Sequence, residues 1–204
     1  MADAMTDREI LLVPHFYRPD NIASASKAAS LLEDAGIRVR LLDQGEPGSE
    51  QPIDKDPVLN QLERVAPDSQ AAAGCELVLV LGGDGTFLRA AAVAREQDLP
   101  VLGINLGHVG FLAEGEAESL ETAIAHVIDR TYFVEDRMTI DVQVLDAEGK
   151  PIETSWALNE CSVENTDRTR VLDAILEVDF RPVSSFGCDG VLISTPTGST
   201  AYAF

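Results

Sequence analysis

The sequence predicts an α/β fold in which an N-terminal Rossmann-like domain with a parallel sheet precedes an antiparallel all-β domain. In the first two thirds of the chain, short apolar runs alternate with helical patterns, which is typical of a parallel sheet with helical crossovers. After residue 137, apolar and polar residues alternate and no helix of ordinary length intervenes, which indicates antiparallel strands. We therefore expect one domain over residues 1–137 and another over residues 138–204.

Each expected element depends on a local pattern. Short apolar runs predict strands in the first domain over residues 9–13, 37–42, 76–81 and 101–104. Helical spacing of apolar residues predicts helices over residues 22–35, 58–65, 87–96 and 120–128. Asn21 is a candidate cap of the first helix and Gly36 its stop, and residues 43–56 are expected to form a loop. Strands in the second domain are predicted over residues 138–144, 156–163, 175–180 and 190–194, with a turn at 148–151.

The composition is acidic, with 35 acidic residues against 15 basic residues and a formal net charge of −20. Because nucleic acids and anionic membranes are bound through clustered Lys and Arg, this balance argues against both kinds of partner. Cys75, Cys161 and Cys188 are far apart, so neither a zinc site nor a disulfide framework is predicted. No signal-peptide pattern and no membrane-spanning apolar run is found, so a reducing cytoplasm is the expected location.

The pentapeptide Gly-Gly-Asp-Gly-Thr at residues 82–86 is the most informative motif. It lies between a predicted strand and a predicted helix, and its glycines let a ligand phosphate approach backbone N–H groups. The candidate phosphate-binding residues are Gly82, Gly83, Gly85 and Thr86. An anion site would normally avoid a carboxylate, so Asp84 is expected to take part in chemistry or to bind a metal ion. The other interpretation is a tight turn with an acidic helix cap.

Two further segments carry polar side chains that suit a ligand. Asn159 and Glu160 combine an amide with a carboxylate, which suits ribose hydroxyls that both donate and accept. Because adjacent strand residues point to opposite faces, both reach one ligand only at a strand end or bulge. The segment 194–202, Ser-Thr-Pro-Thr-Gly-Ser-Thr-Ala-Tyr, offers hydroxyls and an aromatic ring. Taken alone, each segment is also compatible with a solvated strand end or a helix cap.

Taken together and in this order, these segments resemble the NAD kinase family. The resemblance extends from about residue 77 to residue 204 and is carried by residues 82–86, 159–160 and 189–202, with Asn105-Leu106-Gly107 and Gly110-Phe111-Leu112. Phe-Gly-Cys-Asp-Gly at residues 186–190 resembles actinobacterial members. The glycine motif alone is shared with diacylglycerol and sphingosine kinases, whereas the combination is much more specific.

The resemblance implies transfer of a phosphoryl group from ATP, or in some members from polyphosphate, to the adenosine-ribose 2′-hydroxyl of NAD, giving NADP. It implies Mg²⁺, or another divalent cation, as the ion that accompanies ATP. Asp84 is implied as the catalytic residue, acting on this hydroxyl as a base or hydrogen-bond acceptor. The residues implied in NAD binding are Asp84, Gly85, Arg89, Asn159, Glu160, Arg170, Asp189, Thr200, Ala201 and Tyr202.

Members of this family continue past the tyrosine into further strands, whereas this chain stops at Phe204. We therefore expect a C-terminally truncated chain with an incomplete β domain, and its activity alone stays an open question. The full-length protein is expected to be a homodimer or homotetramer. Two other functions remain open: a lipid kinase of the diacylglycerol kinase type, which a charge of −20 disfavours, and a non-catalytic nucleotide-binding fragment.

Overall fold

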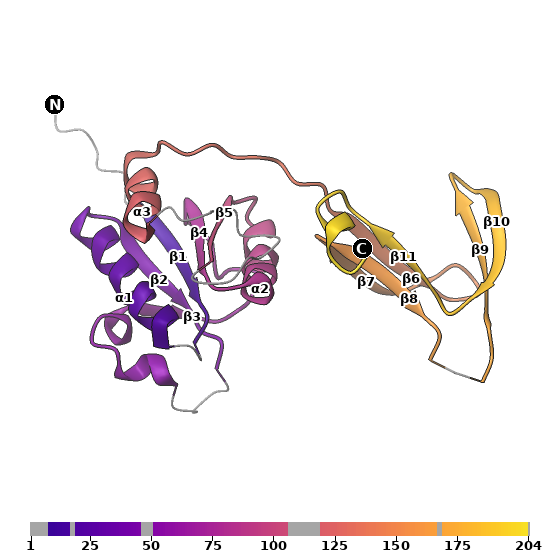
Figure 1. Ribbon diagram of the computed structural model, residues 1–204, viewed down its shortest axis with the longest axis horizontal. Coiled ribbons are helices and arrows are strands. Elements are labelled where there is room, and N and C mark those ends of the chain that lie inside the picture. The colour runs from indigo at the N-terminus through magenta and orange to yellow at the C-terminus, as the bar shows by residue number, and fades with distance from the viewer. Residues whose placement is uncertain (1–7, 17–18, 46–50, 106–118, 167–168, 204) are drawn as a thin grey trace. The chain divides into compact units, whose positions relative to one another are not determined.

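The computed structural model describes residues 8–16, 19–45, 51–105, 119–166 and 169–203 of the chain. The chain divides into two compact units, Met1–Val134 and Glu135–Phe204 (Figure 1). The first unit contains a parallel sheet with helices and the second contains antiparallel strand pairs, which confirms the predicted fold class. None of the helices in these ranges is long and apolar enough to cross a membrane.

The sheet of the first unit has five parallel strands in the order β3-β2-β1-β4-β5. Their bounds are β1 Glu9–Pro14, β2 Arg38–Leu42, β3 Glu63–Val65, β4 Leu77–Leu81 and β5 Val101–Ile104. The interior strand β4 consists entirely of buried Leu and Val, as expected for a parallel strand that is covered on both faces.

Helices on both faces of the sheet complete the first unit. They are α1 Pro19–Asp34, α2 Asp84–Arg95 and α3 Leu120–Asp129. Leu32 of α1 and Ile124 of α3 belong to the same buried core as Leu79. Val93 of α2 belongs to a second core together with Val78. Because successive strand residues point to opposite faces, β4 contributes to both cores.

The strand order changes direction between β1 and β4. From β1 the sheet continues through β2 and β3 on one side, and from β4 it continues to β5 on the other. Just beyond the adjacent ends of β1 and β4, the His15 N–H donates to the Leu81 carbonyl at 2.9 Å. Ligands of open parallel sheets bind at such switch points, on the carboxyl side of the strands. Residues 82–86 follow β4 at this point.

Three predicted elements of the first unit differ from the structure. Helix α1 begins at Pro19, so Asn21 is a buried residue of the helix and not its cap. Helix α2 begins at Asp84, earlier than predicted. The helix predicted over residues 58–65 is wrong, because a 3₁₀ turn at Leu59–Gln61 leads into β3. Pairing with β2 is a tertiary contact that outweighs the helical spacing of the apolar residues there.

The second unit contains three antiparallel strand pairs, β6–β7, β8–β11 and β9–β10. The strands are β6 Ile140–Leu145, β7 Pro151–Ala157, β8 Glu160–Glu164, β9 Leu172–Val178, β10 Arg181–Cys188 and β11 Gly190–Ser194. A 3₁₀ turn at Gly198–Thr200 follows β11. Leu158 is the one buried apolar residue in the described part of this unit.

Strand boundaries in the second unit also correct the prediction. The strand predicted over residues 156–163 is two strands, β7 and β8, which are interrupted at Leu158 and Asn159. The strand predicted over residues 175–180 ends at Val178, since Asp179 and Phe180 form a tight turn with φ of 50° and 62°. The sequence pattern also misses β10, whose residues RPVSSFGC lack a regular apolar alternation.

Candidate functional site

The glycine turn at residues 82–86 joins β4 to α2 at the switch point of the first sheet. Gly83 is the N-cap of α2 without a side-chain cap, and its carbonyl accepts the N–H groups of Thr86 at 2.9 Å and Phe87 at 3.1 Å. The first N–H groups of a helix have no intrahelical partners, and the positive end of the helix dipole lies there. The turn therefore has the properties of an anion site.

Glycine is favoured at the three positions of the turn for different structural reasons. A Cβ atom at Gly82 would lie 2.8 Å from Thr86 Oγ1 and 3.2 Å from His15 Cβ, so the fold itself favours glycine there. At Gly83 and Gly85, a Cβ atom would meet nothing within 4 Å, and both residues are exposed. Neither has a left-handed φ. Their lack of side chains leaves the backbone open to an approaching ligand.

Asp84 lies between these two open glycines as the first residue of α2 and is half-buried. Thr86, by contrast, is only 5% exposed, and its hydroxyl packs beside Gly82. The backbone N–H of Thr86 already donates to Gly83, so this residue supports the conformation of the turn. Asp84 thus supplies the only carboxylate of the motif, at the exposed side of an anion site.

Arg89 is exposed one turn further along α2. Its Nη1 donates to Gln44 Oε1 at 3.2 Å, and Gln44 Nε2 donates to the carbonyl of Pro14 at 3.1 Å. These two hydrogen bonds link the guanidinium to the carboxyl end of β1. Sequence reasoning misses Gln44, although a polar residue shortly after a buried strand is a usable signal in a parallel sheet.

Asp43 begins the segment that follows β2 on the same side of the sheet. Its Oδ1 accepts hydrogen bonds from Gln51 Nε2 at 2.9 Å and from the Gly45 N–H at 3.1 Å. The Gln51 hydrogen bond, followed by that of Gly45, lowers the pKa of the Asp43 carboxyl below its ordinary value. Asp43 therefore stays ionised near neutral pH and acts as a structural acceptor.

Asn159 and Glu160 lie where β8 begins, with Glu160 as its first residue. Asn159 Oδ1 and Glu160 Oε2 are buried, and neither atom has a hydrogen-bond partner among the residues that the structure describes. A buried acceptor without a donor costs about 1–3 kcal/mol. Both atoms are therefore suited to accept hydrogen bonds from a ligand, and the strand end lets adjacent side chains serve the same one.

The segment after β11 folds back onto Asn159. The Thr195 N–H donates to the Asn159 carbonyl at 2.8 Å, and the Gly198 N–H donates to Thr195 Oγ1 at 3.0 Å. The hydroxyls of residues 194–202 consequently differ in burial. Thr195 is buried and bonds backbone groups inside the unit, whereas Ser199 and Thr200 are exposed.

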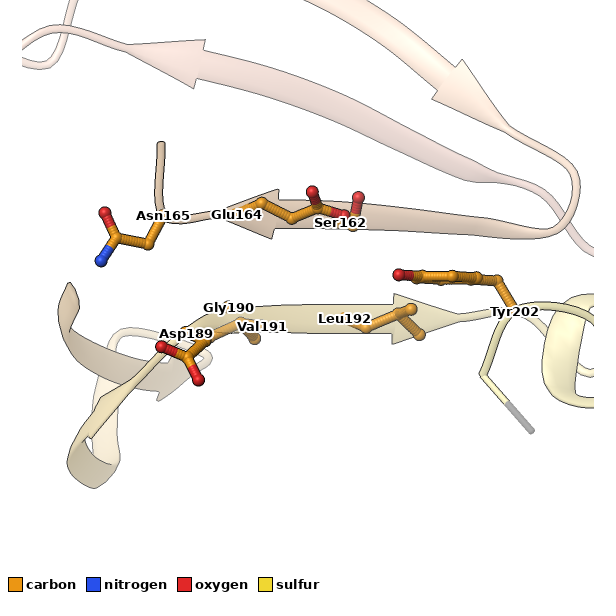
Figure 2. Close-up of a pocket in the computed structure, with 8 residues that line it drawn as sticks. All are labelled: Ser162, Glu164, Asn165, Asp189, Gly190, Val191, Leu192 and Tyr202. Atoms are coloured by element: carbon orange, nitrogen blue, oxygen red, sulfur yellow. The ribbon is translucent and has the colours of Figure 1, made fainter. Parts of the chain in front are cut away.

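A pocket of about 320 Å³ lies along the β8–β11 pair. Figure 2 shows Asp189 directly before β11 and the ring of Tyr202 beside the two strands. Two of the predicted NAD-binding residues, Asp189 and Tyr202, thus line one pocket. The other lining residues, which sequence reasoning misses because they form no motif, are Ser162, Glu164, Asn165, Gly190, Val191 and Leu192.

Arg170 is connected to this pocket through Asn165. Asn165 Nδ2 donates to the Arg170 carbonyl, and the Asn165 N–H donates to the Asp189 carbonyl at 2.8 Å. Within the second unit, the predicted residues therefore gather at both ends of the β8–β11 pair. Asn159 and Glu160 lie at one end, and Asp189 with Arg170 lies at the other.

Thr200 and Ala201 lie at the end of the 3₁₀ turn that follows β11 and leads to Tyr202. The Ala201 N–H donates to the Gly198 carbonyl at 2.9 Å, so the turn is closed by its own backbone. In the first unit, Asn105 directly follows β5. The other motif residues predicted there, 106, 107 and 110–112, lie outside the described residues.

In the described part of the chain, no group of three or more His, Cys, Asp or Glu side chains is arranged to hold a metal ion. The glycine turn offers the single carboxylate of Asp84. This donor set does not fit a metal held by protein ligands alone. It fits an ion that takes most of its ligands from phosphates and water, as Mg²⁺ commonly does.

Comparisons with known proteins agree with this architecture. The description "ATP-NAD kinase N-terminal domain" matches residues 10–132, and "ATP-NAD kinase C-terminal domain" matches residues 158–204. An NAD kinase of Corynebacterium efficiens is 64% identical over 199 residues, which are 98% of this chain and 62% of that protein. An NAD kinase of Corynebacterium diphtheriae is 58% identical over 202 residues, which are 99% of this chain and 63% of that protein.

A solved structure shares the fold. The crystal structure of yeast NADH kinase complexed with NADH matches with a TM-score of 0.76 at 21% identity, covering 97% of this chain and 60% of that chain. The chain thus spans less than two thirds of the length of these relatives. The two domain matches follow one another in the same order as the two units, and they include the glycine turn and the segment after β11. The chain therefore belongs to the NAD kinase family.

Proposed function

We propose that this protein phosphorylates the adenosine-ribose 2′-hydroxyl of NAD and thereby forms NADP. The observation that carries the proposal is the start of α2, which has no side-chain cap and presents Asp84 between two glycines with open backbone. Membership of a family described as ATP-NAD kinases supports ATP as the phosphoryl donor. Polyphosphate carries the same kind of terminal phosphoryl group and is the second donor to be tested.

The glycine turn supplies the phosphate-binding groups in this proposal. Backbone N–H groups at Gly83 and Gly85 bind phosphate oxygens at the positive end of the α2 dipole, and Arg89 adds a positive charge. Phosphoryl transfer usually has a loose transition state, so positioning the nucleophile matters more than removing its proton early. Asp84 accordingly accepts a hydrogen bond from the 2′-hydroxyl, orients it and takes its proton late in the reaction.

The second unit supplies groups that bind the dinucleotide. Asn159 Oδ1 and Glu160 Oε2 are buried acceptors that suit ribose hydroxyls. Asp189 and Tyr202 line the pocket of Figure 2, where an aromatic ring suits stacking on a base. The remaining members of the proposed NAD-binding set are Arg170, Thr200 and Ala201.

Magnesium enters the proposal with ATP, as part of the substrate. Mg²⁺ keeps several waters and is usually bound through one or two carboxylates together with substrate phosphates, where it offsets their charge. Asp84 is the described carboxylate closest in sequence to the proposed phosphate-binding backbone.

A cytoplasmic location and assembly as a homodimer or homotetramer belong to the same proposal. Cys75, Cys161 and Cys188 are all free thiols, which suits a reducing compartment. Light scattering coupled to size-exclusion chromatography measures the oligomeric state directly.

The proposal is tested by incubating the protein with ATP, Mg²⁺ and NAD and measuring NADP with a strictly NADP-specific dehydrogenase. Parallel reactions contain polyphosphate in place of ATP and NADH in place of NAD. Two forms are compared: the 204-residue chain and a chimera in which the matching remainder of the C. efficiens relative follows Phe204. NADP from the chimera alone means that the added part is required, whereas a lack of NADP from both forms overturns the proposal. The active form is the 204-residue chain if it makes NADP by itself, and the chimera if only the chimera does.

A further inference from the structure

We propose that Thr195 is a positioning residue for NAD binding, which acts through Asn159 and Glu160 and does not itself contact NAD. Together with Gly198 it forms a clamp on the peptide that precedes β8. The inference rests on the function proposed above, because it assigns a role to the support of the NAD-binding side chains. Among the hydroxyl residues of 194–200, the predicted NAD-binding set contains only Thr200, which is exposed, whereas Thr195 is buried.

The Thr195 hydroxyl bridges two backbone segments. It donates its one hydrogen to the Leu158 carbonyl at 2.5 Å, lies 3.1 Å from the Asn159 carbonyl, and accepts the Gly198 N–H at 3.0 Å. Only a group that donates and accepts at once can do this. Since Thr195 is 2% exposed, solvent has little access to replace either bond. Loss of the hydroxyl would leave a buried carbonyl and a buried N–H unpaired.

Gly198 contacts the same peptide. A Cβ atom at Gly198 would lie 2.0 Å from the Asn159 carbonyl oxygen and 2.5 Å from the Asn159 Cα atom, so no side chain fits unless the backbone moves. The Asn159 carbonyl also accepts the Thr195 N–H at 2.8 Å and the Ser194 hydroxyl at 3.4 Å. The peptide between Leu158 and Glu160 is thus held by both hydrogen bonds and close packing.

The clamp ends where the strand ladder begins. Glu160 pairs with Ser194 in the β8–β11 register, so the clamp and the strand pairing together fix the backbone of Asn159 and Glu160, the two residues proposed to bind NAD. Asn159 Oδ1 and Glu160 Oε2 are buried without partners in the described part of the chain, and their aim depends on this backbone. A shift of the clamped peptide would move both acceptors away from a ribose hydroxyl at the same time. Thr195 therefore contributes to NAD affinity from a buried position.

The test compares three threonine variants in the active form. Thr195→Val keeps the shape of the side chain and removes the hydroxyl, Thr195→Ser keeps the hydroxyl, and Thr154→Val is a matched control on an exposed position of β7. We expect Thr195→Val to raise the KM and the calorimetric Kd for NAD about tenfold, which corresponds to the net loss of about one hydrogen bond between the displaced acceptors and NAD. The KM for ATP and kcat should stay within about twofold, and Thr195→Ser should restore NAD binding to within about twofold.

Two measurements separate positioning from a general loss of stability. Hydrogen exchange of the Gly198 amide, followed by NMR without NAD, should become faster in Thr195→Val and stay slow in Thr195→Ser, because only the valine removes its acceptor. In an Asn159→Ala background, Thr195→Val should weaken NAD binding much less than tenfold, because the Asn159 side chain, one of the two that Thr195 positions, is already absent.

Each outcome decides between the two proposals. Unchanged NAD affinity in Thr195→Val, or an undiminished tenfold effect in the Asn159→Ala background, overturns the positioning role and leaves the kinase function intact. If Thr195→Val does not fold, Thr195→Ser still decides, since a Kd weakened tenfold with the hydroxyl present contradicts the clamp. If neither wild-type form binds NAD, the proposed function fails, and the inference about Thr195 fails with it.

Discussion

The unit Met1–Val134 buries its apolar side chains on both faces of a parallel sheet, whereas the unit Glu135–Phe204 leaves many of them exposed. Leu79 in the first unit is 0% exposed, while Ile175 and Phe180 in the second are 69% and 98% exposed. Two-stranded pairs alone are only marginally stable. A packed core therefore holds the first unit together, and strand pairing with local hydrogen bonds holds the second.

This contrast shows two ways of positioning a functional residue. Asp84 begins a helix that packs on the sheet through Ala90 and Val93, so a core of many contacts fixes it. Asn159 is fixed by a few specific contacts from Thr195 and Gly198. We expect substitutions at the site of the first unit to change the chemical step, and those in the second unit to change NAD binding.

The largest expected effect is that of Asp84→Asn, which keeps the shape of the side chain and removes the charge. If Asp84 orients the 2′-hydroxyl and accepts its proton, kcat should fall about 1000-fold, within the range typical of general acid–base groups. The Kd for NAD, measured by calorimetry, should stay within about threefold, because few binding contacts are lost. Asn159→Ala should do the reverse and raise the KM for NAD more than it lowers kcat. Equal losses of kcat and NAD affinity in Asp84→Asn would contradict a purely catalytic role.

The next effect concerns stability and compares Leu79→Ala with Ile175→Ala. Leu79→Ala opens a cavity in a fully buried strand and should lower the free energy of unfolding of the first unit by about 3 kcal/mol. Ile175→Ala removes an exposed side chain and should change the free energy of unfolding of the second unit by less than about 0.5 kcal/mol. Urea unfolding followed by circular dichroism reports the first unit, where all described α-helices lie, and fluorescence of Trp156 reports the second. A similar loss from both substitutions would show that burial does not distinguish the two units.

A third comparison separates the glycines of the turn. Gly85→Ala adds a methyl group where the chain has open space, so stability should be kept or rise by up to about 1 kcal/mol. If a ligand occupies that space, kcat/KM should nevertheless fall on the order of 100-fold, since the substrate is displaced by about the size of a methyl group. Gly82→Ala clashes with Thr86 and His15 and should destabilise the first unit by about 1–3 kcal/mol. Wild-type turnover in Gly85→Ala would show that no substrate approaches this backbone.

The fold of the first unit could be predicted because its signals are local. The all-apolar run of β4 and the glycine turn after it identify a buried parallel strand and a helix start. The edge strand β3 could not be predicted, since only its pairing with β2 makes it a strand. The break between β7 and β8 also depends on a tertiary contact, because Gly198, which packs against the Asn159 backbone, lies much later in the sequence.

The candidate site could be predicted only as a set of residue types. The order of the glycine turn, Asn159-Glu160 and the segment 194–202 indicates a nucleotide site, and burial then assigns different tasks to neighbouring residues. Thr195 differs from Thr200 by burial alone, which the sequence does not show. Gln44 becomes visible only when strand order places it beside Arg89.

The smallest expected effect is the loss of stability when a carboxylate in an ion pair is neutralised. One such carboxylate is compared in each unit. Glu76, which directly precedes β4, accepts hydrogen bonds from Arg8 Nη2 at 2.6 Å and from Arg130 Nη2 at 2.6 Å. Arg8 Nη1 also donates to the Ile128 carbonyl at 2.7 Å. This network ties the end of α3 to the sheet. In the second unit, the pair of Glu135 and Arg137 is exposed on the surface, where ion pairs contribute little.

We therefore expect Glu76→Gln to lower the free energy of unfolding of the first unit at pH 7 by about 1 kcal/mol, and Glu135→Gln to change that of the second by less than about 0.5 kcal/mol. Burial acts to raise the pKa of Glu76, but hydrogen bonds from Arg8 and Arg130 outweigh it, so the pKa lies below its ordinary value of 4.5. A carboxyl with a lowered folded-state pKa stabilises the protein above its unfolded-state pKa and loses that contribution as pH falls through the folded-state value. The difference between wild type and Glu76→Gln should consequently be full above about pH 5 and shrink below pH 4.5. Urea unfolding at a series of pH values measures it, and a difference that grows on acidification would contradict the assignment.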